Sequence, residues 1–205
     1  MRKNNAIKYI FIIVAAVLIS NVIQFYVFNQ NNMEQKDDTL PPIYESKANL
    51  YTDYSSGVQN IYRFLVNLNN AHTRNEAKFF SDGFISGMSA DHYTYLESII
   101  QKMDHGENTN EVQRIIETNQ NLYLMIYELR DYFDVKENNA DFPDHWNEVH
   151  TLLEEITNQI ASGSSESTTL YNITSYPENF IIKEDYKTTM SSLNENIAKV
   201  IELIR

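Results

Sequence analysis

Acidic and imidazole side chains are concentrated between positions 144 and 154, where they could bind a divalent cation. They are Asp144, His145, Glu148, His150 and Glu154. His150 and Glu154 are four residues apart, so a helix would place them on one face, and both side-chain types bind metals. Two ligands are too few for a tight site, and Val149 and Leu153 take the inward positions of the same helix. We therefore favour a solvent-exposed polar face over a metal site.

A second acidic stretch, Asp104 to Glu111, resembles a calcium-binding loop in composition alone. An EF-hand loop needs Gly at its sixth position and Glu at its twelfth. Counted from Asp104, these positions hold Thr109 and Ile115. The stretch is therefore predicted to be a turn between two helices, with Gly106 as the stop signal for the preceding helix.

Motifs of the common enzyme classes are absent. The sequence has no glycine-rich nucleotide-binding motif, no zinc-protease motif and no nucleophile elbow. It has no Cys, which excludes disulfides, thiolate metal sites and cysteine nucleophiles. No His has a Glu three residues before it, so the di-iron motif of helical bundles is also missing. We expect no catalytic residues, no metal site and no cofactor, and the chain is not expected to be an enzyme.

The strongest candidate for a binding site, of a partner or of a ligand, is a short aromatic stretch. Its residues are Phe79, Phe80, Gly83, Phe84, Gly87 and Met88. On a helix, Gly83 and Gly87 form a bare stripe that another backbone can approach closely. One interpretation is a tight crossing or a break between two helices. The other is an apolar surface that binds a partner or a small apolar ligand.

Helices must position these residues, because apolar side chains recur at intervals of three and four along most of the chain after residue 43. The predicted helices cover residues 44–70, 90–104, 110–135, 143–161 and 183–205. A capping box begins the aromatic stretch, with Thr73 as N-cap and Glu76 three residues later. The predicted fold class is therefore all-α: an antiparallel bundle of four to five helices that follows a single N-terminal transmembrane helix.

Two segments leave alternatives open. In helix 110–135 the apolar positions follow a 3.5-residue period, which Asn119 interrupts. This amide either is buried and fixes the register or lies at a solvated edge, and we favour the edge. The helix could also mediate self-association. Residues 162–180 form a polar connection in which 169–173 are either a short helix or an extended piece.

The N-terminus indicates membrane insertion. Residues 1–8 carry three basic side chains and no acid, and residues 9–28 are almost entirely apolar. Twenty residues of helix span about 30 Å, the thickness of a bilayer core. We predict a cytoplasmic basic flank at 1–8 and a transmembrane signal anchor at 9–28. A cleaved signal peptide and a buried core helix are the alternatives, although the apolar run is longer than a signal-peptide core.

The remaining chain is predicted to lie outside the cytoplasm. Residues 29–43 are a polar linker that ends in two prolines, and residues 44–205 are the extracytoplasmic helical bundle domain. The chain is then a single-pass protein of the cell membrane with a cytoplasmic N-terminus. Its abundance of Asn, Ile, Lys and Tyr suits an AT-rich bacterial genome.

The net charge of −12 restricts the partners. Nucleic-acid binding requires clustered positive charge, so we expect no nucleic-acid partner. The leading hypothesis is a membrane-anchored, non-enzymatic extracytoplasmic domain that binds another cell-envelope protein. The alternative is a small-molecule-sensing helical bundle that signals through a membrane partner.

Overall fold

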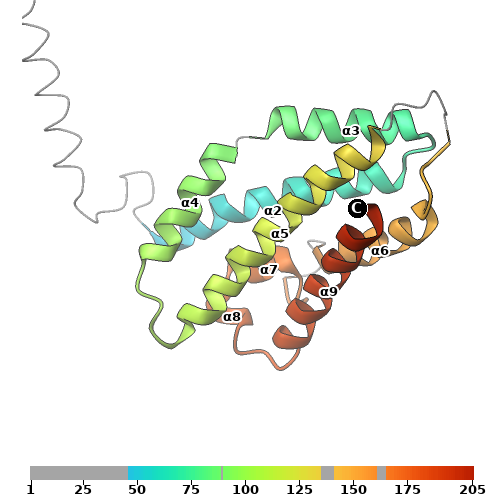
Figure 1. The fold of residues 1–205 in the computed structure, drawn as a ribbon. Coiled ribbons are helices and arrows are strands. Elements are labelled where there is room, and N and C mark those ends of the chain that lie inside the picture. The colour runs from blue at the N-terminus through green and yellow to red at the C-terminus, as the bar shows by residue number, and fades with distance from the viewer. Residues whose placement is uncertain (1–45, 89, 135–140, 161–164) are drawn as a thin grey trace, which may run out of the picture. The chain divides into compact units, whose positions relative to one another are not determined.

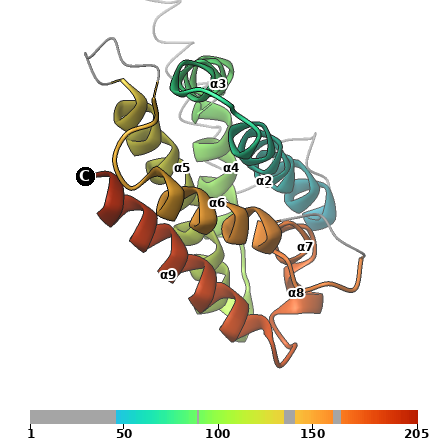
Figure 2. The same cartoon turned by 90° about the vertical axis from the view of Figure 1, so that its right-hand side faces the viewer.

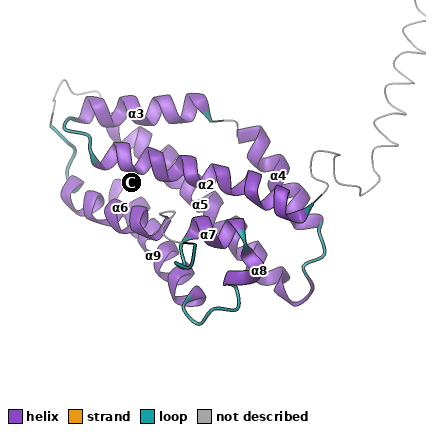
Figure 3. Ribbon diagram, turned by 180° about the vertical axis from the view of Figure 1, so that it is seen from behind, coloured by secondary structure: helices purple, strands orange, loops and turns teal. Residues whose placement is uncertain are grey.

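The structure is a computed structural model that describes residues 46–88, 90–134, 141–160 and 165–205. Every regular element in these ranges is a helix, which confirms the predicted all-α class (Figure 3). The α-helices are α2 (Lys47–Asn69), α3 (Arg74–Gly87), α4 (Ala90–Lys102), α5 (Thr109–Phe133), α6 (Trp146–Ile160), α7 (Leu170–Ser175), α8 (Pro177–Phe180) and α9 (Tyr186–Ile204), and η2 (Gly106–Asn108) is a 3₁₀ turn.

The predicted membrane anchor at 9–28, its basic flank and the linker at 29–43 lie outside the described residues. None of the helices that the structure describes is both long enough and apolar enough to cross a membrane.

One continuous apolar core joins the four long helices α2, α5, α6 and α9. Leu65, Leu122, Leu153 and Leu193, one from each helix, are all fully buried in it. These side chains occupy positions that recur at intervals of three and four residues. That spacing keeps the apolar side chains of each helix on one face. α3 lies along α2 at the outside of this core, and α4 follows it (Figures 1 and 2).

The long helices do not all run antiparallel, and the prediction needs correction here. Hydrogen bonds from Tyr186 to Glu111 and from Asn194 to Thr118 pair the start of α9 with the start of α5 and its middle with the middle of α5. α5 and α9 are therefore parallel. In contrast, Asn196 on α9 bonds Glu155 on α6, and Ser192 bonds Gln159, so α6 runs the opposite way. In an up-down-up order of three long helices, the first and third must be parallel when they touch.

The prediction of four to five helices left out α3 and α8, whereas α7 confirms the short-helix alternative for residues 169–173. α3 is a full helix rather than a short apolar stretch, and α7 and α8 occupy most of the connection predicted as polar. α7 packs between α2 and α6, with Leu170 and Ile173 fully buried. Its position places residues 170–175 of that connection against the core.

The start of α6 differs from the predicted start at residue 143. α6 begins at Trp146, whose N–H donates to the carbonyl of Pro143. His145 has a φ of 66°, in the left-handed region, so the helix cannot extend through it. Phe142 instead stacks on Trp146, with ring centroids 4.4 Å apart, and covers this end of the core.

Asn119 is 2% exposed on α5, so the interpretation that it lies at a solvated edge was wrong. Its amide bonds the hydroxyl of Tyr54, and its Oδ1 has no hydrogen-bond partner among the described residues. The apolar seam of α5 around it is buried within this domain. Self-association through helix 110–135 stays a prediction.

Candidate functional site

The six residues of the aromatic stretch line one groove between α2 and α3, with a volume of about 470 Å³. α2 adds Asn60, Arg63, Phe64 and Asn67, and the groove ends at Tyr93 of α4 and Tyr123 of α5. The residues from α3 and its C-cap are Phe79, Phe80, Gly83, Phe84, Gly87 and Met88. The structure therefore brings together the whole predicted set and adds a second wall from α2.

The groove exists because α3 is held mainly near its N-terminus. Thr73 caps the helix by accepting from the N–H of Glu76, as the capping box predicted. The side chain of Glu76 reaches the N–H of His72 rather than that of the cap residue. Arg74 donates to the carbonyl of Phe133, at the end of α5, and is itself buried.

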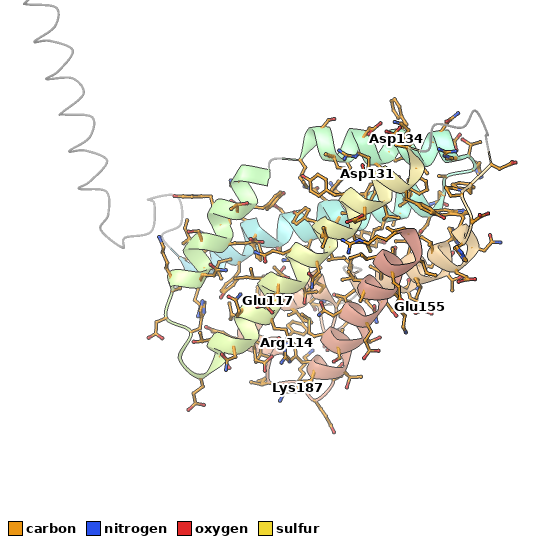
Figure 4. All side chains as sticks on the ribbon, in the orientation of Figure 1. Arg114, Glu117, Asp131, Asp134, Glu155 and Lys187 are labelled. Atoms are coloured by element: carbon orange, nitrogen blue, oxygen red, sulfur yellow. The ribbon has the colours of Figure 1, made fainter. Side chains whose placement is uncertain are left out.

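A second attachment lies one turn further along α3. Lys78 pairs with Asp134, which is labelled beside α3 in Figure 4, at 2.7 Å. This hydrogen bond raises the pKa of Lys78 and lowers that of Asp134. Of all residues in α3, only Arg74, Ala77 and Ser81 are buried, and after residue 81 the helix meets the core only through the partly buried Phe84 and Ile85. The C-terminal half of α3 thus leaves room beside α2.

The glycine stripe faces open space. A Cβ atom added at Gly83 or Gly87 would meet no heavy atom within 4 Å. No other helix crosses tightly at this stripe among the described residues, which removes the tight-crossing interpretation. Phe79, one turn before Gly83, is 76% exposed.

The two walls of the groove differ in chemistry. The α3 wall is aromatic, and its Phe84 packs on Phe64 of α2 with ring centroids 4.7 Å apart. The α2 wall presents Asn60, Arg63 and Asn67, which are spaced by three and four residues and so share one helix face. Sequence reasoning missed this wall, because polar residues at that spacing are typical of any solvated helix face.

Arg63 is the only charged residue of the lining, and no lining residue is acidic. Its side chain makes no ion pair with any residue that the structure describes. The groove therefore offers an exposed guanidinium beside an aromatic wall. This combination can bind an anion that carries an apolar group.

Two tyrosines close one end of the groove. The rings of Tyr93 and Tyr123 lie 6.0 Å apart, and Asn60 donates to the Tyr93 hydroxyl at 3.3 Å. Gly57 of α2 makes room for them, because a Cβ there would lie 2.6 Å from Tyr93 Cε1 and 3.0 Å from the Tyr123 hydroxyl. Burial raises the pKa of Tyr123, so this phenol stays neutral in the physiological range.

Another polar group lies near this end, on α4. Glu97 is 7% exposed and accepts hydrogen bonds from Tyr54 at 2.9 Å and from Gln120 at 3.0 Å. Burial, followed by the charge of Glu97, raises the pKa of Tyr54. The signal for this network was present in the sequence: Glu97 adjoins Leu96 and lies between Tyr93 and Ile100, on the apolar side of its helix. The network connects α2, α4 and α5 where they support the tyrosines.

The two acidic clusters do not assemble into metal sites. His150 pairs with Glu154 at 3.9 Å, and its Nε2 lies 3.0 Å from the carbonyl oxygen of Asn69. His145 lies 3.9 Å from Glu148. Across the described ranges, no three His, Asp or Glu side chains converge as a ligand set. Glu148 and Glu154 are exposed on α6.

The turn predicted at 104–111 contains the 3₁₀ segment η2 (Gly106–Asn108), and its last three residues form the first turn of α5. The Asp104 carboxylate accepts from the N–H of Gly106, whose φ of 54° favours glycine. α4 ends at Lys102, four residues before that glycine.

No family model matches this chain, and no curated protein or solved structure matches it either.

Proposed function

We propose that the chain is a membrane-anchored, non-enzymatic extracytoplasmic helical domain that binds another protein of the cell envelope. The observation that carries the proposal is the unpartnered aromatic surface of α3, where Phe79 is 76% exposed beside a groove of about 470 Å³. Large aromatic side chains at the centre of such surfaces dominate binding energies in protein interfaces.

The chemistry of the groove supports binding over catalysis. Its lining consists of aromatic rings, amides, two glycines, Met88 and one guanidinium. Nucleophilic or general acid–base chemistry needs an activated nucleophile or a carboxylate or imidazole placed at the reacting atoms. The lining offers neither a carboxylate nor an imidazole, whereas aromatic and Arg side chains are enriched at binding interfaces.

The predicted anchor supports a partner in the same membrane. Residues 9–28 would hold the domain at the bilayer surface, and residues 29–43 would act as its tether. Tethering raises the effective concentration of the domain near membrane partners, so a modest affinity suffices. The net charge of −12 disfavours adhesion to anionic lipid headgroups.

Site-specific photocrosslinking of the full chain in the cells that make it tests the proposal. p-Benzoylphenylalanine replaces Phe79, and a matched variant carries it at Ile182, which is 81% exposed in the turn after α8. We expect a discrete adduct with one membrane protein from position 79 and none from position 182. Absence of an adduct at 79, or the same adducts from both positions, would refute the proposed interface.

The membrane topology can be tested separately by cysteine labelling. The native sequence has no cysteine, so each variant carries a single reactive thiol. Single variants Ser191→Cys, on α9, and Lys3→Cys, in the basic flank, are exposed to a membrane-impermeant maleimide in intact cells. We expect labelling of the first and protection of the second until the cells are lysed. The reverse pattern would place the domain in the cytoplasm.

A second candidate function is small-molecule sensing, and the size of the groove favours it. Small-molecule sites typically have volumes of about 300–1,000 Å³ and combine apolar walls with a few polar groups. The groove between α2 and α3 has this size and this combination.

A further inference from the structure

We infer that the groove between α2 and α3 binds a carboxylic acid with an apolar body, whose carboxylate pairs with Arg63. This inference rests on the second candidate function, ligand sensing, and names the ligand class. It commits to a small monoanionic amphiphile as the occupant.

The apolar body is required by the α3 wall. Phe80, Phe84 and Met88 are only partly buried, and the stripe of Gly83 and Gly87 leaves the space in front of it empty. An apolar group placed there would cover the exposed aromatic surface and leave water, which is favourable in proportion to the area removed. No side chain of this wall has a nitrogen or oxygen atom that could bond a polar group in the ligand body.

The carboxylate is required by the α2 wall. Arg63 is the only ion in the lining and lacks an ion pair within the described ranges, whereas Lys47, Lys78 and Arg205 each pair with a carboxylate. A guanidinium binds a carboxylate through two parallel hydrogen bonds. A ligand that carries an ammonium group would be repelled there.

The number of charges limits the ligand further. One guanidinium balances one negative charge, and the other polar groups of the α2 wall are the neutral amides of Asn60 and Asn67. A polyphosphate or a dicarboxylate would leave an uncompensated charge next to the aromatic wall, which is costly. A monocarboxylate therefore fits the lining better than a multivalent anion.

Binding of three matched probes to the full chain in lipid nanodiscs tests the inference. The probes are 4-phenylbutyrate, 4-phenylbutan-1-ol and 4-phenylbutylammonium, which share one apolar body and differ in charge. Ligand-observed NMR at neutral pH reports the dissociation constants, and empty nanodiscs correct for partition into lipid. We expect the acid to bind about tenfold more tightly than the alcohol, since a charge-assisted hydrogen bond contributes about that factor.

Two variants and one control separate the roles of the walls. Arg63→Gln should reduce the affinity for the acid about tenfold and leave that for the alcohol unchanged. Lys187→Gln removes the same charge at the start of α9, away from α3 (Figure 4), and should change neither affinity. Gly83→Leu fills the space in front of the stripe and should abolish binding of every probe, while the thermal midpoint is kept or raised.

Equal affinities for the acid and the alcohol, or equal effects of Arg63→Gln and Lys187→Gln, would overturn the inference. Failure of all three probes would overturn it as well. If position 79 still crosslinks to a membrane protein in that case, the groove is a protein interface and the proposed partner-binding function stands. If the acid binds as expected but no adduct forms, sensing stands and partner binding at α3 fails.

Discussion

The same substitution, Gly to Ala, should have opposite effects at two helical positions of this domain. At Gly57 an added Cβ would lie 2.6 Å from Tyr93 Cε1 and 3.0 Å from the Tyr123 hydroxyl. At Gly83 it would meet nothing within 4 Å. The comparison therefore tests both the packing at the closed end of the groove and the emptiness of its open side.

The magnitude follows from two terms. Replacing Gly by Ala inside a helix stabilises it by about 0.5–1 kcal/mol at either position. Overpacking at Gly57 costs about 1–3 kcal/mol, since the two tyrosine rings must move. The helix term is common to both variants, so the difference between Gly57→Ala and Gly83→Ala isolates the packing term. At about 2–4 °C per kcal/mol for a chain of this size, we expect midpoints that differ by several degrees, with Gly83→Ala the higher.

Fluorescence of the single tryptophan gives the assay. Trp146 stacks on Phe142 and contacts the Phe133 ring, so its emission reports loss of the core. Thermal unfolding of the full chain in nanodiscs is followed for each variant and for Gly57→Ala combined with Tyr93→Ala. Gly57→Ala should then lower the thermal midpoint less in the Tyr93→Ala background than in the native chain.

A midpoint for Gly57→Ala equal to or above that of Gly83→Ala would refute the packing at α2, α4 and α5. Destabilisation by Gly83→Ala would show instead that α3 lies closer to another element than this structure places it. Both results concern residues that line or support the groove, so either would also remove the basis for its proposed ligand.

Three further predictions concern stability. Thr73→Ala should lower the free energy of unfolding by about 1 kcal/mol, because the N-cap of α3 is lost; Thr151→Ala, on the exposed face of α6, should change it little in the same denaturant titration. Glu97→Ala should cost about 1–3 kcal/mol, since the buried hydroxyl of Tyr54 loses its acceptor, and an unchanged stability would contradict the network. Burial raises the pKa values of Tyr54 and Tyr123 above 10, so the stability that their neutral forms contribute is full below pH 10 and is lost as the pH rises further. Tyrosinate absorbance in an alkaline titration should therefore appear in two stages, the second with unfolding, and a single stage would contradict the burial.

The long helices were predictable because their apolar residues are spaced by three and four residues over many turns. α5 illustrates this: its buried positions include Ile115, Leu122 and Leu129, each one heptad after the last. This spacing places the apolar residues on one face of an α-helix but not on one face of a β-strand. What it could not provide is the relative direction of α5 and α9, which depends on how three helices pack around one core.

The short helix α7 was not predictable in the same way, because its buried residues are largely polar. Asn172 and Ser175 are buried, yet their side chains bond main-chain carbonyls, those of Ser167 and Tyr171. Hydrogen bonding of this kind offsets the free-energy cost of burying polar groups. A sequence that reads as a polar connection can therefore enter the core when its buried polar side chains bond main-chain carbonyls of their own segment.

Only one of the two walls of the candidate site could be predicted from the sequence. Its α3 wall could be identified from residue types, since phenylalanines and glycines together are unusual on an isolated helix outside the core. Its α2 wall could not be identified in this way, because Arg63 and Asn67 are typical of a solvated helix face. They form one wall of a groove only because α3 lies opposite them. The charge that sets the ligand class in our inference lies on this second wall.

The weak attachment of α3 connects stability to binding. The helix buries only Arg74, Ala77 and Ser81, while its Phe80, Phe84 and Ile85 are partly buried against the core. Its cap is a local interaction, and the Lys78–Asp134 pair, which joins it to the end of α5, is partly exposed. A surface ion pair contributes less than about 1 kcal/mol, so α3 is among the elements most easily displaced from the core. An occupant that packs between α2 and α3 would supply the apolar burial that α3 lacks. Occupancy should therefore stabilise α3 more than the core helices, and hydrogen exchange of its amides is the measurement in which that difference would be largest.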